Sequence, residues 1–202
     1  QEGMDVARFN FSHGTHEEQK KRLTKLRLLR ERYGRPVATL LDTKGPEIRV
    51  RDFKDGAITL QKSDEFVLTG REVEGDEHIV TITYPELVSD VKVGQRILID
   101  DGLIEMTVKE LTDTDIICDV NNGGKVSNHK GINVPGIHLS LPYISEVDKS
   151  DLLFGIEEDV DYVAASFVRT AEDVLQIRRL LHENGGEQIK IIAKIENREG
   201  VN

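Results

Sequence analysis

The amino-acid sequence predicts an α/β protein with parallel strands, interrupted by an inserted all-β module. In both outer parts of the chain, short apolar runs alternate with segments whose apolar residues recur at three- and four-residue steps, as they do in helices. Between residues 50 and about 135 this helical period is absent, and turn residues separate short alternating runs. The outer parts therefore have the order β–α–β and α–β–α–β, with the β module between them.

The first predicted strand lies within VARFNFSHGT, residues 6–15. Side chains in a strand alternate between two faces, so this stretch has one apolar face and one face with a row of polar groups. We expect the apolar face to pack against helices and the polar row to line a site. The apolar face carries Ala7, Phe9 and Phe11, and the other face carries Val6, Arg8, Asn10 and Ser12.

A capping-box pattern, Thr15 followed by Glu18, predicts that a helix begins directly after this strand. Gly34 and Pro36 then end the helix. The helix is rich in Lys and Arg, which fits either an anion-binding face or a solvated outer face. Because the whole chain is acidic, we interpret it as a solvated face. The apolar stripe consists of Leu23, Leu26, Leu29 and Tyr33, and the basic residues are Lys20, Lys21, Arg22, Lys25, Arg27, Arg30 and Arg32.

The run PVATLL at residues 36–41 indicates a strand that is buried on both faces. It leads through DTKGPEIR, residues 42–49, into the β module, which we predict to be a small antiparallel β-barrel or a sandwich. The expected strands of the module lie at 57–61, 65–68, 78–83, 96–100, 103–108 and 115–120.

After the β module the alternation of strand and helix returns. Ser145 is the expected N-cap of one helix, and Thr170 with Asp173 marks the start of another. The strands that flank this second helix are expected at 161–168 and 189–196. We therefore divide the chain into an α/β part at 1–49, the β module at 50–136 and a second α/β part at 137–202.

The chain has 202 residues, of which 38% are hydrophobic and 32% charged, as is ordinary for a globular protein. The net charge of −10 argues against nucleic acid as a partner, because phosphate binding needs a basic surface. The single cysteine, Cys118, excludes an intramolecular disulfide and fits a reducing compartment. No apolar run is long enough to span a membrane, and no signal peptide is visible. The chain begins without Met and close to a strand, so we expect it to be part of a longer protein.

Each of the four predicted parallel strands ends in polar residues. Sites of α/β proteins lie at the carboxyl ends of the strands, so four polar ends on one rim favour a functional site over helix capping alone. The residues are Arg8, Asn10, Ser12 and His13 after the first strand, Asp42, Thr43, Lys44, Glu47 and Arg49 after the second, Ser166, Phe167 and Arg169 after the third, and Lys194, Glu196 and Asn197 after the fourth.

These residue types define an ionic chemistry. Arg8, Arg49 and Lys194 are cations suited to a phosphate or a carboxylate. Asp42 and Glu196 offer hard oxygen ligands for Mg²⁺ or a monovalent ion. A lysine beside a metal-binding carboxylate can stabilise negative charge as it develops, which indicates metal-assisted phosphoryl transfer. The residues alone leave open a metal-assisted aldolase or lyase that acts through an enolate.

Four weaker signals receive structural interpretations. His13 and His16 have no nearby Cys or third His to complete a zinc site. The NNGG run at 121–124 opens no helix and is interpreted as a turn. Cys118 lies in an alternating run and is interpreted as a core residue. For Arg169, a helix-flanking ion pair and a ligand contact stay equally open.

At these residues the sequence resembles the pyruvate kinase family, and the resemblance covers the whole chain. It rests on VARFNFSHGTHEEQ, LLDTKGPEIR, HKGINVPG, LPYISEVDKSDL, AASFVR and KIIAKIENREGV, which stand in the family's order. The resemblance implies the second to fifth strands of an eight-stranded (β/α) TIM barrel. It also implies that the β module is a lid that closes over the site, with hinge positions at Gly45, Pro46, Gly131 and Pro135.

The resemblance assigns substrate and nucleotide roles to individual residues. Arg8 would contact the phosphate of phosphoenolpyruvate and approach the nucleotide. Lys194 would stabilise the transition state, and Ser166 would lie near the substrate. The residues that would face ATP or ADP are Asn10, Phe11, Ser12, His13, Arg49 and Lys130.

The resemblance also implies two kinds of metal ion. Glu196 would ligate Mg²⁺ or Mn²⁺. Family members with Lys at the Glu47 position tend to dispense with K⁺, so Glu47 implies a K⁺-dependent enzyme. The K⁺ ion would be held by Asn10, Ser12, Asp42 and Thr43, the last through its backbone carbonyl.

The implied reaction transfers the phosphoryl group of phosphoenolpyruvate to ADP, and the enolate left behind is protonated to pyruvate. The resemblance places a second metal carboxylate, a substrate threonine and effector control beyond this chain, so we expect residues 1–202 alone to be inactive. Two alternatives stay open: a non-catalytic piece that binds nucleotide or ions, and an aldolase barrel that acts on phosphoenolpyruvate or pyruvate. The family further implies a cytoplasmic homotetramer.

Overall fold

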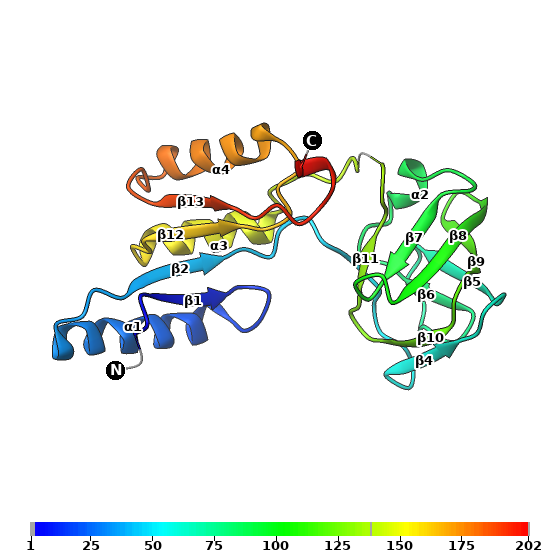
Figure 1. Ribbon diagram of the computed structural model, residues 1–202, viewed down its shortest axis with the longest axis horizontal. Helices are drawn as coiled ribbons and strands as arrows, with labels where there is room; N and C mark the ends of the chain where they lie inside the picture. The colour runs from blue at the N-terminus through cyan, green and yellow to red at the C-terminus, as the bar shows by residue number, and fades with distance from the viewer. Residues whose placement is uncertain (1–2, 138, 202) are drawn as a thin grey trace. The chain divides into compact units, whose positions relative to one another are not determined.

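The computed structural model describes residues 3–137 and 139–201, and the chain forms two compact units (Figure 1). Residues 1–46 and 142–202 form the first, which we call the α/β unit, and residues 47–141 form the second, the β unit. Each unit has its own cluster of buried hydrophobic residues. The unit boundaries lie a few residues from the domain boundaries that the sequence suggests.

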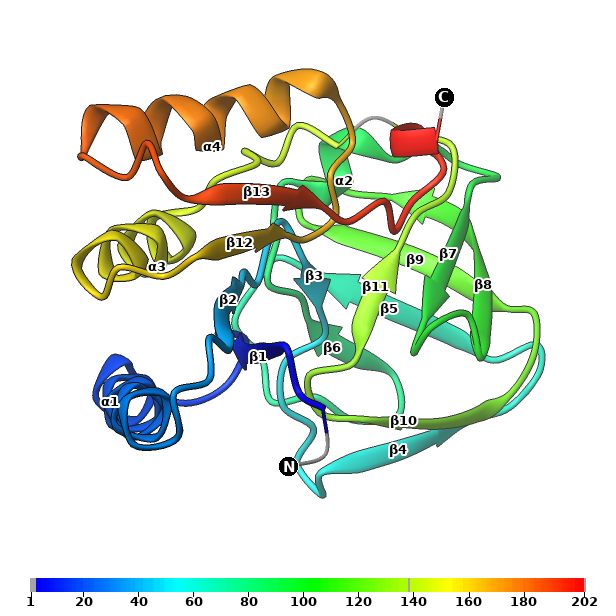
Figure 2. The ribbon, with the colours of Figure 1, turned by 60° about the vertical axis from the view of Figure 1, so that its left-hand side comes forward.

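The α/β unit contains a sheet of four parallel strands within its described residues, in the order β1-β2-β12-β13. Figures 1 and 2 show its long helices along one side of this sheet. The strands are β1 (Val6–Asn10), β2 (Ala38–Asp42), β12 (Tyr162–Ala165) and β13 (Lys190–Ala193), and the helices are α1 (His16–Tyr33), α3 (Glu146–Glu157), α4 (Ala171–Glu183) and the short 3₁₀ helix η1 (Glu199–Val201).

The three long helices begin where the sequence predicts, because each start is encoded by a local capping box. The hydroxyl groups of Thr15, Ser145 and Thr170 accept hydrogen bonds from backbone N–H groups three residues later. The acidic side chains at those later positions bond back to the caps. At the other end of α1, Gly34 takes the left-handed conformation with φ of 59°, as predicted for a residue that ends the helix.

Five of the seven basic residues of α1 are exposed, as expected for a solvated face, but Arg27 and Arg30 are half-buried, and Lys20, Arg27 and Arg30 form ion pairs outside the helix. Lys20 Nζ lies 2.7 Å from Glu158 Oε1, and Arg27 Nη1 lies 2.9 Å from Glu158 Oε2. Arg30 Nη2 lies 3.0 Å from Asp161 Oδ2. These ion pairs connect α1 to the segment between α3 and β12, a tertiary pairing that a helix pattern cannot reveal.

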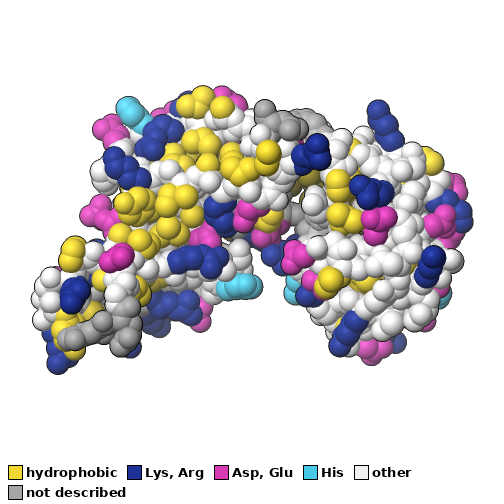
Figure 3. Space-filling view, in the orientation of Figure 1, with side chains coloured by type: hydrophobic (Ala, Val, Ile, Leu, Met, Phe, Trp, Pro, Cys, Tyr) yellow, Lys and Arg dark blue, Asp and Glu magenta, His cyan; other side chains and the backbone are white. Residues whose placement is uncertain are grey.

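The core of the α/β unit lies between the sheet and its helices. Phe9 and Phe11 are buried there and Ala7 packs against them, which confirms the predicted apolar face of the first strand. Hydrophobic side chains also gather on the visible face of the α/β unit in Figure 3. Val6 in β1 and Ile192 in β13 are exposed. Across the described residues, every helix falls short of the length and hydrophobicity that a membrane crossing requires.

The β unit contains a seven-stranded sheet and a two-stranded sheet in its described residues. A bridge between Val50 and Ile82 connects the ends of the larger sheet, so that sheet closes on itself. The larger sheet has the order β3-β11-β7-β8-β9-β5-β6, with β3 (Ile48–Arg49), β11 (Gly131–Asn133), β7 (Arg96–Ile99), β8 (Ile104–Leu111), β9 (Asp115–Val120), β5 (Glu65–Thr69) and β6 (Ile79–Thr81), and the smaller pairs β10 (Gly124–Ser127) with β4 (Ala57–Leu60).

Two expectations for this unit need correction. The sheet is not purely antiparallel, because β5 and β6 pair in parallel. A short helix, α2 (Leu87–Asp90), also lies in the stretch where no helical period is visible. Cys118 is fully buried in the core, as predicted. In the NNGG run, a Cβ on Gly123 would lie 2.5 Å from the Leu60 carbonyl oxygen. Glycine is therefore required at this position, because the two backbones pack too closely for a side chain.

Candidate functional site

The carboxyl ends of the four parallel strands bring their polar residues to one edge of the sheet. Asn10, the last residue of β1, stands opposite Asp42, the last residue of β2. The last residue of β12 stands opposite the last residue of β13 in the same way. Because the strands are parallel and in register, the residues that follow them are gathered together. Within the α/β unit, the polar residues that follow the four strands therefore lie at one edge of the sheet, whereas Glu47 and Arg49 belong to the β unit.

Asp42 lies at the centre of this rim and is only 2% exposed. Its Oδ2 accepts a hydrogen bond of 2.5 Å from Arg8 Nε, and its Oδ1 accepts one of 3.0 Å from Lys194 Nζ. A buried carboxylate is tolerated when cations pair with it and satisfy its lone pairs. Asp42 therefore holds two cations from different strands in one place.

Lys194 directs its ammonium group at three oxygen atoms. Besides Asp42, Nζ lies 2.9 Å from Ser166 Oγ and 3.3 Å from Glu196 Oε1. Glu196 is in turn fixed by its second oxygen, which accepts a hydrogen bond of 3.0 Å from the Phe167 backbone N–H. An ammonium group has three donors, so this set defines its orientation. The lysine is thus preorganised rather than mobile.

Ser166 connects the β2 and β12 ends. Its N–H donates to Thr43 Oγ1 at 3.1 Å, and its hydroxyl donates to the Thr43 carbonyl at 2.6 Å. Tyr143 donates from its hydroxyl to the Ser166 carbonyl at 2.9 Å. Burial raises the pKa of Tyr143 far above its usual range, so the phenol stays protonated and keeps this donor. Sequence patterns did not single out Tyr143, because a lone aromatic after a LeuPro pair carries no signal of such a contact.

Oxygen atoms of several residues gather at this edge of the sheet. Asn10 and Asp42 contribute side-chain oxygens from opposed positions, and the loop after β1 supplies the Ser12 hydroxyl. The Thr43 carbonyl lies within the same hydrogen-bonded group through Ser166. Oxygen ligands with a single carboxylate are the donor set that a weakly charged, hard cation prefers.

The described residues at this edge offer fewer ligands for a divalent metal ion. Glu196 presents one carboxylate at the end of β13, where it is partly exposed. Among the described residues, no group of three or more His, Cys, Asp and Glu side chains gathers in a way that could hold a metal. Glu196 therefore fits the role of one ligand within a larger set.

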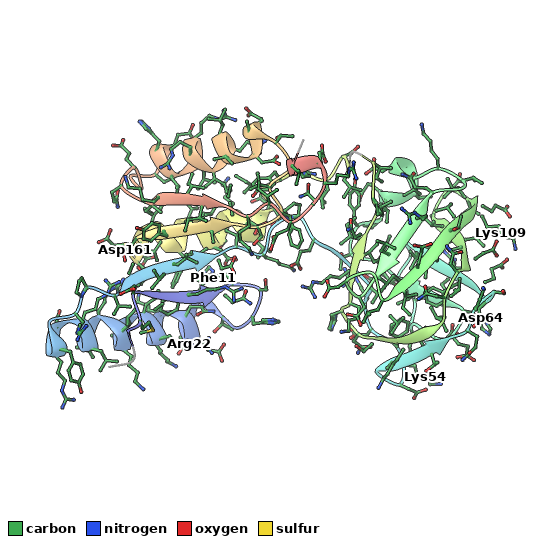
Figure 4. The ribbon with its side chains drawn as sticks, in the orientation of Figure 1. Phe11, Arg22, Lys54, Asp64, Lys109 and Asp161 are labelled. Atoms are coloured by element: carbon green, nitrogen blue, oxygen red, sulfur yellow. The ribbon has the colours of Figure 1, made fainter. Side chains whose placement is uncertain are left out.

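The loop after β1 carries the four residues expected to face a nucleotide in this unit. Phe11 is buried, and its ring packs on the ring of Phe154 at 5.8 Å between centroids. Its backbone N–H donates to the Asp42 carbonyl at 3.0 Å. His13 is exposed, while Asn10 and Ser12 are partly buried. Phe11 is thus the packing residue that anchors the loop (Figure 4).

The other two residues expected to face a nucleotide, Arg49 and Lys130, belong to the β unit. They lie close together because β3 pairs with β11 and the Val50 N–H donates to the Lys130 carbonyl at 2.9 Å. Arg49 Nε lies 2.5 Å from Glu47 Oε2, a hydrogen bond that raises the pKa of the Arg49 guanidinium. Lys130 Nζ lies 2.9 Å from Asp100 Oδ1. Each cation is therefore held by an acidic partner in its own unit.

The side chain of Arg169 forms an ion pair with the first turn of α4. Its Nε lies 3.5 Å from Asp173 Oδ2, and its guanidinium lies 5.8 Å from the centroid of the Tyr143 ring. The helix-flanking ion pair considered for this residue is therefore present. The cation–π contact also places Arg169 against the residue that holds Ser166.

Parallel βα units with charged residues at the carboxyl ends of the strands are characteristic of α/β proteins, the class that includes the (β/α) barrels. The family model of the pyruvate kinase barrel domain matches residues 1–202. The chain belongs to the pyruvate kinase family.

Curated relatives are similar over nearly the whole chain. It is 50% identical to a pyruvate kinase of Staphylococcus haemolyticus over 201 residues, which cover 98% of this chain and 34% of the relative. It is 50% identical to a pyruvate kinase of Clostridium acetobutylicum over 200 residues, covering 98% and 42%. It is 51% identical to a pyruvate kinase of Geobacillus stearothermophilus over 201 residues, covering 98% and 34%. The chain therefore spans well under half the length of these relatives.

Proposed function

We propose that the protein carrying this chain transfers the phosphoryl group of phosphoenolpyruvate to ADP, giving pyruvate and ATP. One observation carries the proposal: the Lys194 ammonium is fixed by Asp42, Ser166 and Glu196 at the carboxyl ends of the strands. Membership of the pyruvate kinase family supports the same reaction. A preorganised cation in this position suits a reaction in which negative charge develops on transferring oxygens.

Arg8 and Lys194 have complementary roles in this proposal. The side chain of Arg8 is 60% exposed although Asp42 holds it, so the guanidinium stays accessible to the phosphate of the substrate. Lys194 is 29% exposed and would stabilise charge on the enolate and on the phosphoryl group in transit. Ser166 orients Lys194, and its place near the substrate stays a prediction.

The residues present would also hold the ions that the family uses. Potassium would be held by Asn10, Ser12, Asp42 and the Thr43 carbonyl, and Mg²⁺ or Mn²⁺ would be bound in part by Glu196. Such cations, when bound, neutralise and orient phosphate oxygens. The nucleotide would face Asn10, Phe11, Ser12 and His13, together with Arg49 and Lys130 of a β unit that acts as a lid, in a cytoplasmic homotetramer.

Replacing Lys194 by Met tests the catalytic proposal directly. Lys194→Met in the full-length protein removes the ammonium but keeps an unbranched side chain, so the fold should persist. We expect the turnover number to fall by a factor of roughly 100 to 1,000, the usual effect of losing one preorganised charge donor. A coupled assay for pyruvate measures the turnover, and circular dichroism checks the fold.

Lys190→Met is the matched control, because Lys190 is an exposed lysine at the start of β13, the strand that Lys194 follows. This variant should turn over at the rate of the unaltered protein. If Lys194→Met also retained nearly normal turnover, the role proposed for Lys194 would be refuted.

We also propose that residues 1–202 alone do not turn over substrate. Glu196 offers a single metal carboxylate, and the chain spans 34% to 42% of the length of the relatives above. The purified 202-residue chain should form no ATP from ADP and phosphoenolpyruvate with Mg²⁺ and K⁺ present. ATP formation above the background of a Lys194→Met chain would contradict this proposal.

A further inference from the structure

A buried glutamine of α1 holds the start and the middle of the loop that follows β1. Gln19 is 1% exposed, and its side-chain amide nitrogen donates to two backbone carbonyls. The hydrogen bond to the Asn10 carbonyl is 2.9 Å long, and the one to the His13 carbonyl is 3.0 Å long. A primary amide has two N–H donors, so both are used on this loop.

The loop held in this way carries two of the oxygen ligands assigned to potassium. Within it, Asn10 Oδ1 accepts a hydrogen bond of 2.9 Å from the Ser12 N–H, which sets the direction of the Asn10 side chain. The Phe11 N–H donates to the Asp42 carbonyl, which ties the loop to β2. The Gln19 contacts complete this frame from the helix side. The position of the Asn10 and Ser12 oxygens therefore depends on the Gln19 amide.

The side-chain oxygen of Gln19 is buried and has no hydrogen-bond partner among the described residues. The side-chain hydrogen bonds of Gln19 to the described residues therefore both run from its amide nitrogen to the loop.

We propose that Gln19 is a positioning residue for the potassium site: it holds the loop so that the Asn10 and Ser12 oxygens stand beside Asp42. The inference rests on the proposed function, because that function assigns the ion to these residues. Gln19 itself touches neither ion nor substrate. Its loss should weaken K⁺ binding by allowing the loop to relax, without removing any ligand.

The test compares how potassium stabilises variants of the full-length protein. The melting temperature is measured against KCl concentration, with tetramethylammonium chloride keeping the ionic strength constant. A fit of the mass-action relation to these data gives the KCl concentration at which half of the folded protein binds K⁺, which is the KCl midpoint. For the unaltered protein we expect K⁺ to raise the melting temperature specifically, by mass action on the folded state. For Gln19→Met, which has no donors, we expect a KCl midpoint roughly tenfold higher, as fits the loss of two hydrogen bonds.

Two further variants separate positioning from general stability. Gln19→His retains one N–H donor and should give a midpoint between those of the unaltered protein and Gln19→Met. Thr39→Val removes another buried polar contact, the hydroxyl that lies 2.8 Å from Asp161 Oδ2. Asp161 precedes β12, at the end of the sheet away from Phe11 (Figure 4). Thr39→Val should lower the melting temperature but leave the KCl midpoint unchanged.

The outcomes distinguish the inference from the proposed function. An unchanged KCl midpoint in Gln19→Met, with a lowered melting temperature as in Thr39→Val, would overturn the positioning role and leave the potassium site intact. If the unaltered protein showed no K⁺-specific stabilisation, the potassium part of the proposed function would fail, and the role of Gln19 with it. If Gln19→Met did not fold, Gln19→His would decide, and an unchanged midpoint there would overturn the inference.

Discussion

Glu158 shows how a single buried acid depends on the basic run of α1. Burial by itself would raise the pKa of Glu158, but hydrogen bonds from Lys20 and Arg27 outweigh it and hold the pKa below its usual range. A carboxyl whose pKa is lower in the folded state contributes stability above its ordinary pKa, and this contribution is lost as the pH falls through the lowered value. Glu158→Gln should therefore reduce the free energy of unfolding at pH 7 by about 2 kcal/mol.

Urea unfolding at a series of pH values measures this effect. Between pH 5 and pH 3 the unaltered protein should lose stability more steeply than Glu158→Gln, because the variant no longer has the carboxylate to protonate. Glu157→Gln is the control, since Glu157 is exposed and its nearest contact with Lys20 is 3.7 Å. Equal acid dependence in Glu158→Gln and the unaltered protein would show that the pairing with Lys20 and Arg27 carries no stability.

Among the elements, those with local signals could be predicted and those made by distant contacts could not. The starts of α1, α3 and α4 are encoded within four residues by their capping boxes, so the sequence predicts them well. The strands β3, β10 and β11 contain two to four residues each, too few to show alternation. The parallel pairing of β5 with β6 could not be predicted either. Alternation of apolar and polar residues shows which face of the sheet a side chain lies on, but not the direction in which the neighbouring strand runs.

The candidate site also contains some contacts that the sequence predicts and others that it does not. The rule that parallel strands present their carboxyl ends at one edge predicts from the sequence that Asp42 and Lys194 lie near each other. The contacts of Gln19 and Tyr143 were missed, because each joins a side chain to a backbone carbonyl. All backbone carbonyls are chemically alike, so the sequence does not show which one will accept a hydrogen bond from a given side chain.

The two units differ in how completely each covers its own apolar surface. In the β unit, the sheet closes through the Val50–Ile82 bridge, and the core includes fully buried residues such as Phe66. In the α/β unit, the sheet has open edges at β1 and β13, and Val6 and Ile192 are exposed. An open sheet leaves backbone groups unpaired at its edges, whereas a closed sheet does not. We therefore expect the β unit to be the more autonomous of the two.

Residues 47–141 expressed alone should therefore fold as a cooperative unit. The hydrophobic cluster of the β unit shares no residue with that of the α/β unit, so separation should remove little of its core. We expect a free energy of unfolding of roughly 5 to 10 kcal/mol, measured by urea denaturation followed by circular dichroism.

Phe66→Ala should lower the free energy of unfolding of residues 47–141 by about 3 to 5 kcal/mol, because it leaves a cavity in a packed core. Leu103→Ala, at a side chain that is 69% exposed, should change it by less than about 0.5 kcal/mol. A broad, non-cooperative transition, or equal effects of the two substitutions, would mean that this core does not hold its packing without the rest of the chain.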